Sequence, residues 1–145
     1  MSLLKPGLIL LGLVAAAPAF PSESDIIGLW LTGDGDGWIE IRQDGNEFIG
    51  VIRGSPDDAD QDPERVDDKN PDPSLRHRKL LGLTIMRGFR HDGGMRWSGG
   101  RIYDPNSGNT YKGNLRLLDR DTLRVRGFIG LSVFGRSDTW TRVRR

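Results

Sequence analysis

The feature of this 145-residue chain that most limits its possible folds is a series of short strand-like segments, each bounded by turn-forming residues. In residues 38–42, two isoleucines alternate with a tryptophan, a glutamate and an arginine, which is the period of two that a half-buried strand requires. Asp44 and Gly45 follow as a two-residue hairpin signal. The pattern predicts strands over residues 26–33, 38–42, 47–53, 80–90, 95–103, 110–118, 122–129 and 136–143.

The predicted strands are joined mostly by short turns, and no helical pattern lies between them. Consecutive hairpins give an antiparallel meander, and closing it into an up-and-down barrel removes the unpaired edges of an open sheet. We therefore predict an all-β, eight-stranded antiparallel barrel, with room for its own side chains or for one small ligand. An outer-membrane barrel would need an apolar outer band with aromatic girdles, whereas arginines recur in nearly every predicted strand.

Residues 1–19 have the pattern of a secretory signal peptide. Lys5 supplies the basic region, residues 8–17 are a short apolar run, and the cleavage motif ending at Ala19 leaves Phe20 as the new N-terminus. A membrane span would need about 20 apolar residues. We expect a periplasmic or secreted protein that does not span the membrane after cleavage and forms one domain over residues 20–145. The alternative is a buried N-terminal helix.

Charge is distributed unevenly along the mature chain. Residues 20–73 carry 15 acidic and 4 basic residues, whereas residues 74–145 carry 5 acidic and 16 basic residues. The chain has no cysteine, which excludes disulfides, so its core must hold itself together. The basic half alone would suit nucleic acid, but export and the acidic first half argue against that partner.

The ends of the predicted barrel suggest how it closes. With an even number of strands, the first strand runs antiparallel to the last, which brings Gly28 and Trp30 beside Arg142. An arginine fork stacked on the tryptophan ring would contribute about 0.5–2 kcal/mol. Gly-x-Trp in the first strand and arginine in the last resemble the signature of lipocalins and related calycin barrels. The alternative is that Trp30 only fills the core.

Longer motifs are more specific. In order along the chain they are DGDGWIEI from Asp34, NPDP from Asn70, LGL from Leu81, GF from Gly88, RWSGG from Arg96, IYDP from Ile102, SG from Ser107, TY from Thr110, DTLRVRGFIG from Asp121 and FG from Phe134. This series resembles an exported bacterial family known as domain of unknown function 2147, over roughly residues 28–142. The resemblance implies a small lipocalin-like β-barrel, and it supplies no reaction, ligand or catalytic residue. The long loop follows the third strand here, whereas lipocalins generally place theirs after the first.

A D-x-D-x-D pattern that starts at Asp58 raises the question of calcium. An EF-hand starting there would need glycine at its sixth position and a bidentate glutamate at its twelfth, and these positions hold Pro63 and Lys69. An EF-hand is therefore excluded, and an irregular, weak calcium site stays open as the alternative.

No zinc site or catalytic constellation is recognisable in the sequence. The chain offers no cysteine, and its two histidines, His77 and His91, lie at loop ends. Residues 130–134, around Ser132, approach a nucleophile elbow but lack its final glycine and its helix. We predict no metal, no cofactor and no enzymatic activity.

Several strands carry side chains that would line a ligand cavity if their polar faces point inward. The candidate ligand-binding residues are Trp38, Glu40 and Arg42, then Trp97, Arg101 and Tyr103, which share one face with Gly99 leaving space, then Arg124 and Arg126. Such a cavity would suit a small polar or anionic ligand. If Ile39, Ile41, Leu123 and Val125 point inward instead, the interior is dry. The cost of burying unpaired charge favours the dry arrangement.

Two functions therefore remain, with an enzyme the least favoured third. The first is an exported, lipocalin-like module that binds a small ligand, with an anion as one option. The second is a structural or protein-interaction module of the cell envelope with a packed, ligand-free barrel. The sequence does not indicate an oligomeric state.

The long loop over residues 55–79 contains eight carboxylates and is predicted to have two halves. Residues 55–69 are too poor in apolar side chains to pack, which favours a mobile acidic segment. Residues 70–79 contain prolines and arginines that favour a tethered return across the barrel mouth. We expect Asp72, Arg76 and Arg78 to anchor this second half against the barrel.

Overall fold

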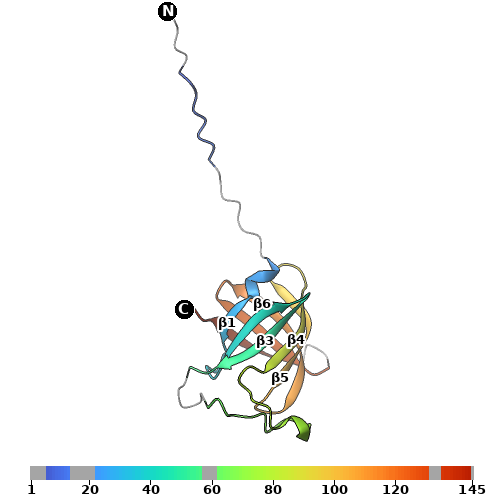
Figure 1. The fold of residues 1–145 in the computed structure, drawn as a ribbon. Coiled ribbons are helices and arrows are strands. Elements are labelled where there is room, and N and C mark those ends of the chain that lie inside the picture. Colours follow the sequence, from blue (N-terminus) through green and yellow to red (C-terminus); the bar gives the residue numbers. More distant parts are fainter. Residues whose placement is uncertain (1–5, 14–21, 57–61, 131–134, 145) are drawn as a thin grey trace, which may run out of the picture.

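The computed structural model describes residues 6–13, 22–56, 62–130 and 135–144. Within these residues, eight antiparallel strands close into one barrel, in which sequence neighbours pair and β1 pairs with β8 (Figure 1). The strands are β1 (Gly28–Leu31), β2 (Trp38–Asp44), β3 (Glu47–Gly54), β4 (Thr84–His91), β5 (Arg96–Asp104), β6 (Asn109–Asp119), β7 (Thr122–Phe128) and β8 (Arg136–Arg142). The predicted all-β, antiparallel up-and-down barrel is confirmed.

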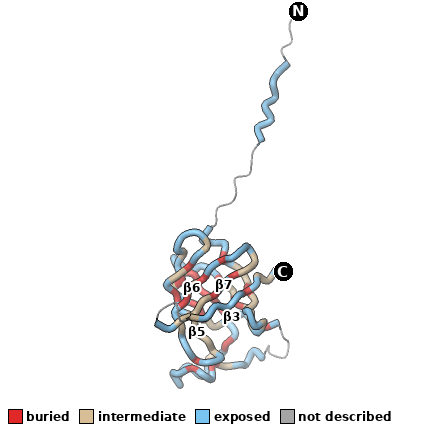
Figure 2. The backbone as a smooth tube through the Cα atoms, turned by 180° about the vertical axis from the view of Figure 1, so that it is seen from behind, coloured by how far each residue is buried: buried red, intermediate tan, exposed pale blue. Residues whose placement is uncertain are grey.

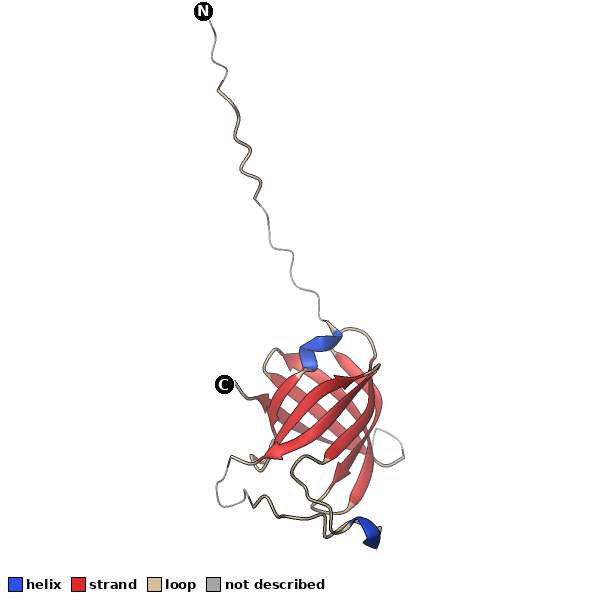
Figure 3. Ribbon diagram, viewed as in Figure 1, coloured by secondary structure: helices blue, strands red, loops and turns tan. Residues whose placement is uncertain are grey.

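The first strand is shorter than predicted because Ile26 belongs to a 3-10 helix, η1 (Glu23–Ile26). Ser22 starts this helix with a capping box: its Oγ accepts a hydrogen bond from the Ser24 amide, and its own amide donates to the Asp25 carboxylate. The helix lies at one end of the barrel (Figure 3). Ile26 is fully buried and packs into the core at that end.

Buried residues recur along the strands of the barrel (Figure 2), and their apolar side chains form one core cluster. The buried core includes Trp30, Ile39, Ile41, Phe48, Met86, Phe89, Trp97, Leu115, Leu117, Leu123, Val125 and Trp140. The isoleucines of β2 and the Leu123–Val125 pair of β7 therefore point inward. Of the two face assignments left open by the sequence, the structure has the one with Ile39, Ile41, Leu123 and Val125 inward.

Adjacent β-bulges interrupt the regular alternation in β4 and β5. The register between β3 and β4 shifts between Phe48 and Gly50, and the register between β5 and β6 shifts between Trp97 and Gly100. Gly88 and Gly99 occupy these irregular segments at φ of 75° and 77°, a left-handed conformation that favours glycine. One extra residue in a strand exchanges the faces of the side chains on either side of it.

The connection from β3 to β4 returns along itself at the end of the barrel opposite η1 (Figure 1). Val66 and Lys79 form an isolated antiparallel bridge, flanked by hydrogen bonds from the Asp67 amide to the Arg78 carbonyl and from the Leu80 amide to the Arg65 carbonyl. Between them lies a second 3-10 helix, η2 (Pro73–Leu75). The fourth strand consequently starts at Thr84, later than predicted.

The described part of the N-terminal region, residues 6–13, is exposed and forms neither helix nor strand. The predicted signal-peptide cleavage site at residues 17–19 lies outside the described residues. Among the residues that the structure does describe, no helix is both long enough and apolar enough to cross a membrane.

Candidate functional site

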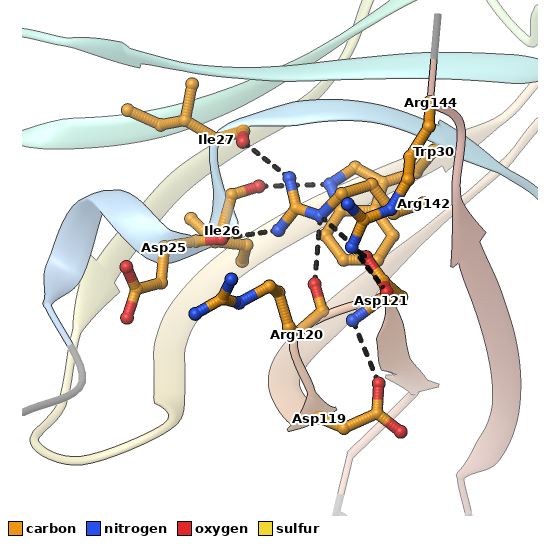
Figure 4. Close-up of polar contacts among 9 residues, drawn as sticks. All are labelled: Asp25, Ile26, Ile27, Trp30, Asp119, Arg120, Asp121, Arg142 and Arg144. Atoms are coloured by element: carbon orange, nitrogen blue, oxygen red, sulfur yellow. Dashed lines mark hydrogen bonds and ion pairs between the residues drawn. The ribbon is translucent and has the colours of Figure 1, made fainter. Parts of the chain in front are cut away.

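Arg142 closes the barrel where β1 meets β8 (Figure 4). Its guanidinium carbon lies 4.3 Å from the centre of the Trp30 ring, and the two residues are directly paired across the strands. The guanidinium donates hydrogen bonds to the carbonyl oxygens of Ile27 at 2.8 Å, Asp25 at 2.6 Å and Arg120 at 2.9 Å. The structure thus ties η1, β1 and the β6–β7 turn to β8 through this one side chain.

Gly28 makes room for this arrangement. A Cβ atom on Gly28 would overlap the Arg142 guanidinium, so a larger residue there would displace the stacked cation. Trp30 in turn donates its indole N–H to the Ile26 carbonyl at 3.0 Å. The residues proposed from the sequence for barrel closure therefore meet at the η1 end, where their contacts are structural.

A buried carboxylate, Asp67, holds the β3–β4 connection against the barrel. Asp67 is completely inaccessible to solvent and accepts hydrogen bonds from the Tyr103 hydroxyl, from Asn70 Nδ2 at 2.8 Å and from Arg78 Nε at 2.9 Å. The Arg78 guanidinium also lies 5.6 Å from the centre of the Tyr103 ring. Tyr103 belongs to β5, so this cluster joins the connection to the barrel wall.

The environment of Asp67 favours its ionised form. Burial alone would raise the pKa of Asp67, but the hydrogen bonds from Tyr103, Asn70 and Arg78 outweigh it and lower that pKa below its ordinary value. Burial and the adjacent Asp67 carboxylate raise the pKa of Tyr103 to about 12. The hydroxyl therefore remains a donor to a charged acceptor throughout the neutral range.

The anchoring residues expected from the sequence are only partly those that the structure uses. Arg78 does reach the barrel, through Asp67 and Tyr103. Asp72 is exposed and caps η2 by accepting from the Ser74 amide, and Arg76 donates to the Asn70 carbonyl, so both organise the connection internally.

The expectation that residues 55–69 do not pack is wrong at Asp67. In addition, Lys69 Nζ donates to the Asn106 carbonyl, and a Cβ atom on Gly108 would overlap the Lys69 carbonyl oxygen. Asp58 and Asp60, the first two carboxylates of the possible calcium pattern, lie outside the described residues.

The polar residues proposed to line a cavity do not face the barrel interior as a set. In β2 the inward positions hold isoleucines, so the inward arrangement of Trp38, Glu40 and Arg42 is wrong. In β7 the inward positions hold Leu123 and Val125, which places Arg124 and Arg126 on the other face.

In β5 the predicted shared face of Trp97, Arg101 and Tyr103 is also wrong. Trp97 is buried in the core, whereas Arg101 is exposed. The bulge at Gly99 separates them, because it adds one residue between the inward Trp97 and the inward Gly100. A glycine inside a strand pattern was the available signal for this bulge.

The outer surface of β4 to β7 carries a dense group of cations, which we call the basic face. It consists of the exposed residues Arg87, Arg96, Arg101, Lys112, Arg116 and Arg124. Two cross-strand rows arise from the pairing: Arg87 lies opposite Arg101, which lies opposite Lys112, and Arg96 lies opposite Arg116, which lies opposite Arg124. Like charges directly opposite one another across a sheet are destabilising.

The described residues provide no ion-pair partner for these cations. Strands β4 to β7 contain acidic residues only at their ends, Asp104 and Asp119, and none of the six cations forms an ion pair with a described residue. Exposed apolar side chains flank the rows: Leu118 is 42% exposed, and Ile129, just beyond β7, is 69% exposed.

The outer surface of β2 and β3 offers a contrast. There Glu40 accepts from Arg53 at 3.3 Å and lies 4.0 Å from Arg42, beside an open groove of about 540 Å³. Both arginines on that side contact a carboxylate, whereas none of the six cations of the basic face forms an ion pair with a described residue.

The packed interior leads to a test of ligand binding inside the barrel. We expect gently purified protein to show the mass of the polypeptide alone by native mass spectrometry, because large aromatic and aliphatic side chains occupy the core. Among the described residues, the buried side-chain polar atom without a hydrogen-bond partner is Trp97 Nε1. A molecule bound in the interior would have to supply an acceptor for it. A stoichiometric small molecule that co-purifies and disappears in Trp97→Phe would contradict a closed, dry interior.

The described residues contain no group of three or more His, Asp or Glu side chains arranged to hold a metal ion. Ser132, the centre of the incomplete nucleophile motif, lies outside the described residues.

Comparisons with known proteins identify the family of this chain and one solved structure with a similar fold. A family model described as "Uncharacterized protein conserved in bacteria (DUF2147)" matches residues 28–142. Among solved structures, the Helicobacter pylori protein HP1028, described as belonging to the lipocalin family, is 20% identical, with 82% of this chain and 83% of that chain covered and a TM-score of 0.75. A redesigned beta barrel is 16% identical over 83% of this chain and 94% of that chain, with a TM-score of 0.44. No curated protein matches. At 20% identity, the similarity to HP1028 shows a shared lipocalin-like fold alone.

Proposed function

The chain belongs to the bacterial family of uncharacterized proteins DUF2147, whose model spans its whole barrel, and within that frame we propose that it is an exported docking module that binds an anionic phospholipid surface through its basic face. The packed barrel is the scaffold that holds this face rigid. The protein acts as an interaction module, and it recognises anions on the outer wall of the barrel and not in the interior. No catalytic step is part of it.

The observation that carries the proposal is the pair of cross-strand rows of uncompensated cations. Each row places three positive charges on neighbouring strands about 4.8 Å apart, and the rows are about 13 Å apart along β6. An isolated protein gains nothing from this repulsion, whereas an extended anionic surface neutralises all the charges together.

A lipid surface is favoured over an acidic protein because apolar side chains accompany the cations. Phe128 lies directly opposite Lys112, Leu118 follows Arg116 on the same outer face of β6, and Ile129 is exposed beyond β7. Cationic and exposed apolar side chains on one surface are the combination that binds at the lipid interface.

Binding to vesicles tests the proposal. The protein purified after export should co-sediment with vesicles that contain phosphatidylglycerol and not with vesicles of phosphatidylcholine alone. Each cation near an anionic membrane contributes about 1 kcal/mol, so the Arg116→Gln/Arg124→Gln variant should bind roughly 30-fold more weakly.

The matched control is Arg42→Gln/Arg53→Gln, which removes the same net charge from the surface of β2 and β3 and should bind like the wild type. Equal losses in both variants would mean that net charge alone matters, and this would overturn a specific docking face. If the protein does not bind anionic vesicles but does bind an acidic protein, the basic face docks to a protein and not to a lipid surface.

A further inference from the structure

Within the basic face, the wall of the barrel is hollowed around Gly99. This recess, which we call the Gly99 recess, has a volume of about 270 Å³. It is lined by Gly99, Gly100, Arg101, Lys112, Gly113, Asn114 and Phe128. Arg101 and Lys112 are directly paired across β5 and β6, so they stand side by side at its rim.

The glycines of the recess are present for different reasons. A Cβ atom on Gly100 would overlap the Phe89 ring, and one on Gly113 would lie 2.8 Å from Phe89 and Ile102, so packing inside the barrel explains both. A Cβ atom on Gly99 would meet only the Gly88 carbonyl oxygen, at 3.9 Å. The bulge therefore leaves open space in front of Gly99 that no described side chain fills.

The groups around this space are donors and cations. Arg101 offers a planar fork that can bind an oxyanion in a bidentate manner, and Lys112 adds a compact charge. Asn114 contributes an amide, and Phe128, opposite Lys112, forms an apolar wall. No carboxylate lines the recess, and neither cation forms an ion pair with a described residue.

We infer that the Gly99 recess binds a single phosphate group, held between Arg101 and Lys112 above the bare backbone of Gly99. Two adjacent cations fit a tetrahedral group that can carry two negative charges, whereas one carboxylate would neutralise only one of them. The inference deepens the proposed docking function: the rest of the basic face attracts an anionic surface, and the recess takes one phosphate. A lipid headgroup and a free phosphate ion present the same chemistry.

Titration with inorganic phosphate, followed by amide NMR at constant ionic strength, tests the recess directly. Saturable shifts should centre on Gly99, Lys112 and Asn114. Lys112→Gln should weaken phosphate binding roughly tenfold, as expected when one charge-assisted contact is lost. Gly99→Asn keeps a residue that tolerates positive φ and places a side chain in the open space, so it should abolish the shifts.

Matched controls exist for both substitutions. Gly93 lies at φ of 78° with open space around its Cβ position, as Gly99 does, so Gly93→Asn controls for backbone effects. Arg53→Gln controls for the lost charge. If phosphate causes no saturable shifts, or if Gly99→Asn and Lys112→Gln bind phosphate as these controls do, the inference is overturned.

The vesicle assay identifies the source of the phosphate. Loss of binding to anionic vesicles in Gly99→Asn supports the recess as a headgroup site, and unchanged vesicle binding with lost inorganic phosphate binding supports it as a site for the free ion. Vesicle binding without any phosphate binding would overturn the recess and leave the docking function. Phosphate binding without vesicle binding would overturn the docking function and leave the recess.

Discussion

Replacing Arg142 by alanine should lower the free energy of unfolding by about 3 kcal/mol or more, a large part of the stability of a small domain. The substitution removes the cation stacked on Trp30 and leaves the carbonyl oxygens of Asp25, Ile27 and Arg120 without this donor. Arg142→Lys should restore little, because an ammonium group lacks the planar fork that reaches these separate carbonyls. Chemical denaturation measures the change.

A double-mutant cycle isolates the contact between the ring and the guanidinium. Trp30→Leu and Arg142→Ala combined should cost less than the sum of the single losses, with a coupling of about 0.5–2 kcal/mol. Arg144→Ala is the matched control, because Arg144 is exposed and its ion pair among the described residues is with Asp121 at the surface, and it should cost less than about 1 kcal/mol. Simple additivity at Trp30 and Arg142 would contradict the stacked seam.

Replacing Asp67 by alanine should destabilise the protein by about 2–3 kcal/mol and release the β3–β4 connection from the barrel. The loss leaves the Tyr103 hydroxyl and Asn70 amide without their acceptor in a buried position. Hydrogen exchange should accelerate in residues 62–80 and remain slow in β6 and β7. Asp72→Ala, which removes an exposed cap of η2, is the control and should leave exchange at Asp67 unchanged.

The same carboxylate gives the stability a pH dependence with a definite sign. Because the pKa of Asp67 is lower in the folded state than its ordinary value of 3.8, its stabilisation is complete above that value and disappears as the pH falls through the folded pKa. The stability difference between wild type and Asp67→Asn should therefore be largest near neutral pH and shrink in acid. A difference that grows on acidification would contradict the assignment.

At high pH the stability depends on the ionisation of Tyr103, whose hydroxyl donates a hydrogen bond to Asp67. Because the pKa of Tyr103 is raised to about 12 from an ordinary value of 10.0, its contribution is complete below 10.0 and is lost as the pH rises through about 12. Tyr103→Phe should remove this alkaline loss of stability.

Local patterns identified the strands well because alternation is a local property. The isoleucines of β2 and the turn at Asp44 and Gly45 require no knowledge of distant residues, and the structure places β2 at Trp38–Asp44. Errors arose where a second local motif or a neighbour in space decided the outcome. Ile26 joined η1 because Ser22 and Asp25 form a capping box, and Leu80 stayed in the connection because its amide bonds to Arg65.

The same distinction between local patterns and contacts in space applies to the candidate sites. The meeting of Gly28, Trp30 and Arg142 could be expected, since an even number of antiparallel strands brings the first beside the last. The role of Asp67 could not be expected, because it depends on a hydrogen bond from Tyr103, which is 36 positions later in the chain. In the sequence it is one of eight carboxylates in an acidic loop.

By itself, the sequence determined an all-β, antiparallel barrel and the place where that barrel closes. The strand period and the turn residues are local features of the sequence, and the even number of strands follows from them. Tertiary structure decided which face of each strand is buried. The cost of burying arginines favoured one answer from the sequence, but that cost has to be compared with the gain from burying isoleucines and leucines over the whole core. Tertiary structure also decided that bulges at Gly88 and Gly99 place Trp97 inside and Arg101 outside. The basic face is the consequence: the cations are in the sequence, but only the closed sheet brings them side by side.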